Sequence, residues 1–151
     1  MTRAHGRSTF TRRGGQGLFE FAVVTLLTVI MLLFVVEMGR VVLVSTTVAN
    51  AARAGVRYAV VHGNSRAAGT TVNNASGPGN NPAQVVTAVT NFASAGPLTT
   101  SLLIVNVTYP GASNAPGQSV NITVVYPYDP LTNYFSHTLR LGSSAQGIIV
   151  F

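Results

Sequence analysis

The chain has 151 residues, of which 47% are hydrophobic and only 8% are charged, and it contains no cysteine. Without cysteine there can be no disulfide, iron–sulfur cluster, thiolate nucleophile or thiolate zinc site, and the length suits one small domain plus an anchor. All nine basic residues are Arg; without residues 1–15, five Arg stand against three acidic residues, which leaves +2 and predicts no nucleic-acid partner.

The first predicted element is a helix that crosses a membrane. From Leu18 to Val36 the only charged side chain is Glu20. As a helix rising about 1.5 Å per residue, this run covers the roughly 30 Å hydrocarbon core of a bilayer. Four Arg and no acid precede it, which predicts a cytoplasmic N-terminus. No small-residue cleavage site follows Val36, so the run does not have the pattern of a secretory signal peptide.

Glu20 is the unusual residue of this run. A charge deep in a bilayer costs at least about 2.5 kcal/mol, so an acid there is more often functional than accidental. The alternative is that Glu20 lies at the interface, where it would favour the positive end of the helix.

Residues 12–21, Arg-Arg-Gly-Gly-Gln-Gly-Leu-Phe-Glu-Phe, resemble the processing motif of type IV prepilins. The resemblance implies that a membrane-bound prepilin peptidase cuts after Gly15 and makes Gln16 the mature N-terminus. It also implies assembly roles for Glu20, then the fifth residue, and for Phe21. A carboxylate within reach of the new α-amino group can neutralise it inside the membrane.

Two later segments make the resemblance specific to one family. Residues 37–40, Glu-Met-Gly-Arg, and residues 51–59, Ala-Ala-Arg-Ala-Gly-Val-Arg-Tyr-Ala, are similar to the signature of TadE-like proteins, the pseudopilins or minor pilins of tight-adherence (Tad/Flp) pilus systems. The aromatic and proline residues at 126–131 resemble a segment that many of these proteins carry. The resemblance implies assembly or helix-packing roles for Glu37, Gly39, Arg40, Arg53, Gly55 and Arg57.

The helical pattern continues past the membrane run. Apolar and small residues recur every three or four positions as far as residue 59, so we predict one helix from about Gly17 to Val61, amphipathic in its second half. The small residues at 49–55 would allow close approach either of another helix or of the protein's own sheet. Glu37 and Arg40 are three residues apart and suit a local ion pair.

A loop and a short helix follow. Residues 63–81 are rich in Gly, Asn, Ser and Thr, which predicts a flexible loop. Asn81 then suits a helix N-cap, with Pro82 at the first helical position. Apolar residues at helical spacing follow until Gly96-Pro97.

The rest of the chain is β-rich. Segments 102–109 and 119–126 alternate apolar and polar residues and are joined by turn formers, so they predict an antiparallel hairpin. Pro127 is expected to end the second strand. A third strand is expected at about residues 138–151, with Gly142 or Gly147 as a bulge. The fold class is therefore α+β and, given the family resemblance, pilin-like.

The predicted organisation has four parts. Residues 1–15 are a basic leader, residues 16–62 a spine helix whose membrane span is about 18–36, residues 63–81 a loop, and residues 82–151 an extracytoplasmic α+β domain.

The side chains do not favour catalysis. His5, His62 and His137 show no metal-ligand spacing, and Asp129 is the only acid outside the anchor. A Ser136–His137–Asp129 set lacks the sequence context of a serine hydrolase. There is no phosphate-binding glycine loop. We expect no enzyme activity, cofactor, metal or small-molecule substrate.

Two functions therefore compete. The first is a TadE-like minor pilin in the cytoplasmic membrane or the extracellular adhesive pilus. It would work with other pilins, Tad inner-membrane assembly proteins and a separate ATPase. The second is a single-pass membrane protein whose extracytoplasmic domain binds a ligand or cell-wall polymer, with the exposed loop as the recognition site.

Overall fold

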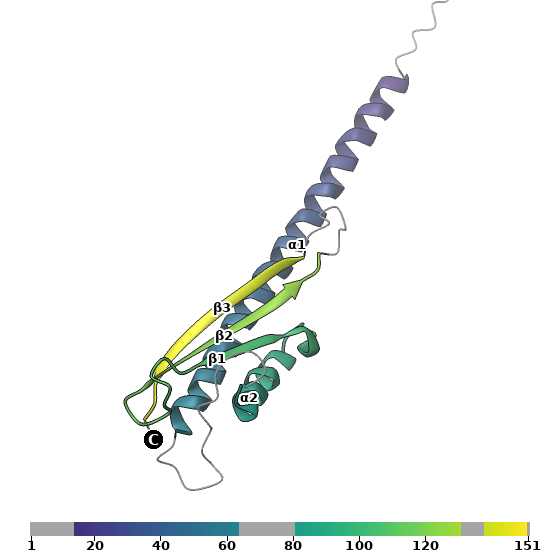
Figure 1. Cartoon of the computed structure of the whole chain (residues 1–151). Helices are drawn as coiled ribbons and strands as arrows, with labels where there is room; N and C mark the ends of the chain where they lie inside the picture. Colours follow the sequence, from purple (N-terminus) through teal and green to yellow (C-terminus); the bar gives the residue numbers. More distant parts are fainter. Residues whose placement is uncertain (1–13, 64–80, 131–137, 151) are drawn as a thin grey trace, which may run out of the picture. The chain divides into compact units, whose positions relative to one another are not determined.

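The computed structural model describes residues 14–63, 81–130 and 138–150, and its elements confirm the α+β prediction (Figure 1). The predicted leader up to residue 13 and the predicted loop from 64 to 80 lie outside the described residues. The elements are α1 (Gly14–Val61), α2 (Ala83–Ser94), a 3-10 turn (Thr100–Leu102), β1 (Ile104–Thr108), β2 (Ser119–Tyr128) and β3 (Leu139–Ile148).

The chain divides into two compact units, Met1–Val36 and Glu37–Phe151, and α1 contributes to both. In the first unit, all the large apolar side chains of the run Leu18–Val36 are exposed. Among the described residues, α1 is the one helix that is long and apolar enough to cross a membrane. A helix with no polar face is suited to lipid or to a shell of other helices.

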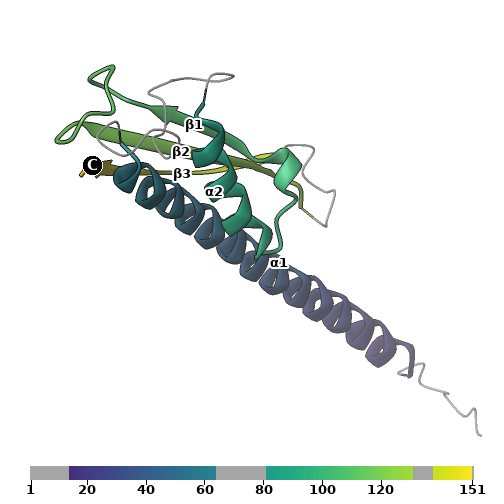
Figure 2. The ribbon, with the colours of Figure 1, turned by 90° about the horizontal axis from the view of Figure 1, so that it is seen from below.

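The second unit contains a three-stranded antiparallel sheet in the order β1-β2-β3. Ile104 pairs with Val125 and Thr108 with Asn121, which confirms the predicted hairpin. One face of the sheet lies over the C-terminal part of α1, and α2 lies beside α1 under the same face (Figure 2). On β2, alternate residues from Val120 to Tyr128 are buried, because successive side chains of a strand point to opposite faces.

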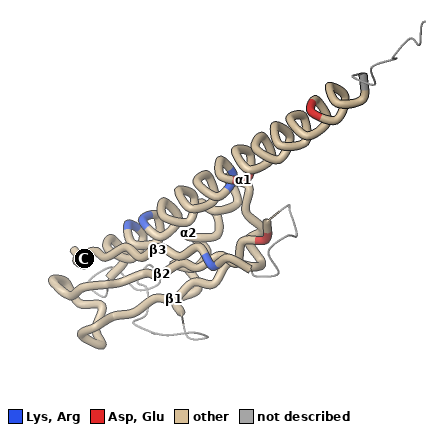
Figure 3. The backbone as a smooth tube through the Cα atoms, turned by 90° about the horizontal axis from the view of Figure 1, so that it is seen from above, with Lys and Arg blue, Asp and Glu red and all other residues tan. Residues whose placement is uncertain are grey.

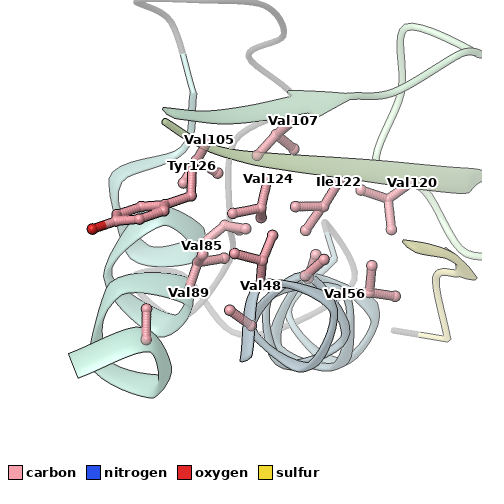
Figure 4. Packing of buried hydrophobic residues seen from close by; sticks show 14 of the residues in the cluster. Val48, Val56, Val85, Val89, Val105, Val107, Val120, Ile122, Val124 and Tyr126 are labelled. Carbon is pink, nitrogen blue, oxygen red and sulfur yellow. The ribbon is translucent and has the colours of Figure 1, made fainter. Parts of the chain in front are cut away.

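The core forms where the two helices meet the sheet. Figure 4 shows Val48 and Val56 of α1 and Val85 and Val89 of α2 directed toward the valines and Ile122 of the sheet. Ala51 and Ala52 are fully buried. The small residues at 49–55 therefore serve packing against the protein's own sheet and second helix.

Gly55 is the point of closest approach in this core. A Cβ built on it would lie 2.5 Å from Val89 Cγ2 and 3.1 Å from Ile122 Cδ1. Because a real Cβ does not approach a neighbour so closely, only glycine lets α2 and β2 contact α1 at this level. Gly147 does the same for β3, since its Cβ would lie 2.6 Å from Val56 Cγ1.

Two expectations about the strands were wrong. Pro127 lies within β2 and pairs with Arg140. The pairing of β1 with β2 ends at Val125, so no described strand pairs with Pro127 on that side, and a residue without an N–H is tolerated there. No bulge occurs in β3, whose pairing with β2 is continuous. Gly147 there serves the close contact with α1 instead.

The expected N-cap of α2 was also wrong. Pro82 is the cap residue and makes no side-chain cap hydrogen bond. Asn81 instead donates from Nδ2 to Val105 O at 2.7 Å and accepts from Val107 N at 2.7 Å. It thereby occupies backbone groups on the side of β1 that faces away from β2, where an unpaired edge would otherwise be exposed.

We predict that Gly55→Leu lowers the free energy of unfolding of the second unit by about 2 kcal/mol, because overpacking a well-filled core costs about 1–3 kcal/mol. Gly39→Leu is the matched control, since a Cβ at Gly39 meets nothing within 4 Å. Urea unfolding of the detergent-solubilised chain, followed by tyrosine fluorescence, measures both. Equal stabilities for the two variants would contradict the packing account.

Candidate functional site

The segment around the predicted cleavage point is helical. Helix α1 begins at Gly14, earlier than the expected Gly17, so the Gly15–Gln16 peptide bond lies in its first turn. A Cβ at Gly15 or Gly17 would meet nothing within 4 Å, so these glycines are not required by packing within the described residues. Each glycine costs a helix about 1 kcal/mol relative to alanine, and this turn therefore unwinds at low cost.

Glu20 and Phe21 are exposed on α1. Glu20 is the seventh residue of the helix, and the first turn contains no acid. The attraction of a carboxylate to a helix N-terminus falls off within the first turn, so this interaction explains little of why an acid stands here. Within the described part of the chain, Glu20 forms no ion pair.

Thr28 is another polar residue in the same apolar run, and its side chain makes a hydrogen bond within the helix. Its Oγ1 donates to the Val24 carbonyl oxygen at 2.8 Å. The hydroxyl is thus satisfied within the helix, as an apolar environment requires. Glu20 has no comparable bond within α1, which separates its role from that of Thr28.

Glu37, Arg40 and Tyr128 form a cluster, which we call the junction cluster, at the start of the second unit. Glu37 Oε1 accepts a hydrogen bond from the Tyr128 hydroxyl at 2.5 Å, across 91 residues of sequence. Glu37 Oε2 lies 3.3 Å from Arg40 Nη1, so the ion pair predicted from their spacing is present. The Arg40 guanidinium carbon lies 5.5 Å from the centroid of the Tyr128 ring.

The Tyr128–Glu37 hydrogen bond is the strongest element of this cluster. Tyr128 is only 2% exposed, and a hydrogen bond to a charged group is worth about 1.5–3 kcal/mol. The Arg40 side chain is 41% exposed, and an exposed ion pair contributes about 0.2–1 kcal/mol. The cluster therefore fastens the last residue of β2 to α1 mainly through the phenol.

The remaining residues of the family signature lie on different faces of α1. Gly55 is buried, whereas Arg53 and Arg57 are exposed on the opposite side of α1, and Arg53 Nη1 donates to Asn50 Oδ1 at 3.2 Å. Figure 3 shows basic residues toward the C-terminal end of α1. Gly39 is exposed and free of steric contacts.

Sequence reasoning did not find Tyr128. The family-like segment at 126–131 drew attention to this stretch, but the expected strand break at Pro127 hid the continuation of β2 that places Tyr128 on the buried face. In the residues that the structure describes, no group of three or more His, Asp or Glu could hold a metal ion. Of the residues considered for catalysis, Ser136 and His137 lie outside the described residues.

The described elements thus form an α+β fold, in which a long helix, apolar and then amphipathic, packs through its C-terminal part against a small antiparallel sheet. The family model described as TadE-like protein matches residues 15–57. Over this segment the chain is similar to TadE-like proteins, as its sequence motifs predict. No curated protein and no solved structure matches the chain.

The buried phenol of Tyr128 has a pKa raised above its usual range, first by burial and then by its hydrogen bond to Glu37. The neutral phenol therefore stabilises the fold fully below pH 10, and this contribution is lost as pH rises through the folded-state pKa.

We predict that Tyr128→Phe lowers the free energy of unfolding at pH 7 by about 2 kcal/mol, because it removes the hydrogen bond that the buried Tyr128 hydroxyl donates to the Glu37 carboxylate. It should also remove one late-titrating tyrosine from the absorbance titration at 295 nm. Burial likewise raises the pKa of Tyr109, so late titration should remain for that residue. Tyr58→Phe is the control, and an unchanged late titration in Tyr128→Phe would contradict the assignment.

Proposed function

We propose that the chain is a TadE-like minor pilin or pseudopilin that is cut after Gly15 and takes part in assembling an adhesive Tad/Flp pilus. The observation that carries this proposal is the family match, which begins at residue 15, next to the predicted scissile bond, and extends through the apolar run to Arg57. The exposed glycines Gly15 and Gly17 beside the bond support it, because a peptidase needs the first turn to unwind.

The proposed topology follows from charge. The basic leader places the N-terminus in the cytoplasm, and the second unit then lies outside the cytoplasmic membrane. After cleavage, the leader's arginines are gone and a single α-amino group at Gln16 must enter an apolar environment. Glu20, four residues away and exposed, is suited to neutralise that amine in its own or a neighbouring subunit.

Assembly then consists of moving the apolar half of α1 from lipid into a bundle of helices. Both environments are apolar, so the transfer does not expose the run to water. The energy for extraction comes from a separate ATPase, because this sequence has no phosphate-binding loop. The partners are a prepilin peptidase, other pilins and Tad inner-membrane assembly proteins.

We predict that Gly15→Ala reduces maturation by about tenfold or more in cells with a matching prepilin peptidase, since a misfit of about 1.4 kcal/mol in the transition state is a factor of ten. Immunoblot mobility measures the cleaved fraction. Gly39→Ala is the matched control, because that glycine is also exposed and uncrowded. Normal cleavage of Gly15→Ala would contradict prepilin-type processing and favour the membrane-anchored ligand-binding protein.

We predict that Glu20→Gln and Glu20→Ala both leave cleavage intact but strongly reduce incorporation into pili, because each removes the charge that neutralises the amine of Gln16. The loss should be tenfold or more, since an uncompensated charge in the membrane costs at least about 2.5 kcal/mol and each 1.4 kcal/mol is about a factor of ten. Thr28→Val is the control, because Thr28 bonds only within α1. Quantification of the chain in sheared pili tests this, and normal incorporation of Glu20→Gln would overturn the neutralisation role.

A further inference from the structure

The second unit contains a groove that has no role in the proposed processing or assembly. It lies between the C-terminal part of α1 and α2, has a volume of about 490 Å³, and is lined by Asn50, Arg53, Ala54, Arg57, Tyr58, Val61, Ala88 and Phe92. Two alanines, a valine and two aromatic residues form its apolar lining, and two arginines contribute its positive charge.

The apolar part of the groove is open. Phe92 of α2 is 43% exposed, although the other face of α2 is buried through Val85, Val89 and Ala93. On α1, the Tyr58 ring stacks on His62, with centroids 4.0 Å apart and an angle of 12° between the rings. This stack holds the Tyr58 ring in place, so the groove has a defined aromatic side before any partner arrives.

Among the residues that the structure describes, no acidic side chain forms an ion pair with the arginines of the groove. Arg53 and Arg57 are four residues apart on α1, where like charges repel by about 0.2–0.5 kcal/mol. The chain has only three acidic side chains, Glu20, Glu37 and Asp129, and the only ion pair among the described residues is Glu37–Arg40. A partner that supplies carboxylates would relieve this repulsion and cover the apolar surface at the same time.

We propose that this groove docks an amphipathic helix of a different protein, with two carboxylates one turn apart that face Arg53 and Arg57. Binding of an apolar helix face in a groove is a common mode of recognition, and carboxylates at positions i and i+4 match two arginines spaced by about 6 Å along α1. Charge complementarity thus selects the occupant.

A second copy of this chain does not fit that description. Its three acidic residues are far apart in sequence, so no helix of a second copy presents two carboxylates one turn apart. The assignment of the partner to the pilus machinery rests on the proposed function, whereas the groove and its chemistry do not.

The test uses the full chain in its native cells, with Phe92 replaced by the photoreactive residue p-benzoylphenylalanine. After irradiation, mass spectrometry identifies the crosslinked segment. The expected adduct is a segment of another protein with an amphipathic helical pattern and two acidic residues four apart. Its yield should fall about tenfold in Arg53→Glu/Arg57→Glu, as expected for a loss of about 1.4 kcal/mol in affinity.

Two matched variants make the result specific. Arg140→Glu changes an exposed arginine on β3, away from the groove, and should leave the crosslink unchanged. Replacing the partner's two acids with Arg should restore crosslinking to Arg53→Glu/Arg57→Glu. Because all three arginines are exposed, tyrosine fluorescence should show that the variants fold normally.

Several results would overturn the proposal: a crosslink to a second copy of this chain, an adduct with lipid only, no protein adduct, or an equal loss in Arg140→Glu. The N-terminus of the protein is sequenced from the same samples. A failed crosslink with Gln16 at the N-terminus would refute the groove alone, whereas an uncut chain that still forms the adduct would refute only the proposed processing.

Discussion

The second unit depends on how closely its helices and sheet approach one another at Gly55. Helix α1 presents an inward face of alanine, glycine and valine, and the absent Cβ at residue 55 is what lets Val89 and Ile122 meet it there. The same geometry leaves Arg53 and Arg57 on the outward face. One stretch of α1 thus supports the core and carries the exposed charge of the groove.

Two of the chain's acidic residues, Glu37 and Glu20, lie on α1 and have different surroundings. Glu37 is held by Arg40 and by the buried phenol of Tyr128, so it serves to fasten β2 to α1. Glu20 has an exposed carboxylate in an otherwise apolar run, where an ionised group is costly. The contrast supports a structural role for Glu37, whereas neutralisation of the Gln16 amine by Glu20 remains a proposal.

The sequence predicts the long helix well, because a continuous apolar run is followed by apolar residues with a period of 3.6, and it predicts the hairpin well, because apolar residues alternate with a period of 2. The sequence-based prediction fails where contacts between residues far apart in the chain determine the local structure. Asn81 suits a helix cap by local rules, yet it binds the edge of β1. Pro127 is typical of a strand end, yet it lies within β2, beyond the last residue of β2 that pairs with β1. Glu37–Arg40 was predictable from spacing, whereas the contact with Tyr128 spans 91 residues and has no local signature.

The central claim is that this chain is made as a precursor whose apolar helix is kept and whose basic leader is removed. The most direct test is the intact mass and N-terminal sequence of the wild-type protein from its native membrane, or from cells that also express a matching prepilin peptidase. The account predicts a chain that begins at Gln16. A full-length chain in the presence of active peptidase would contradict it.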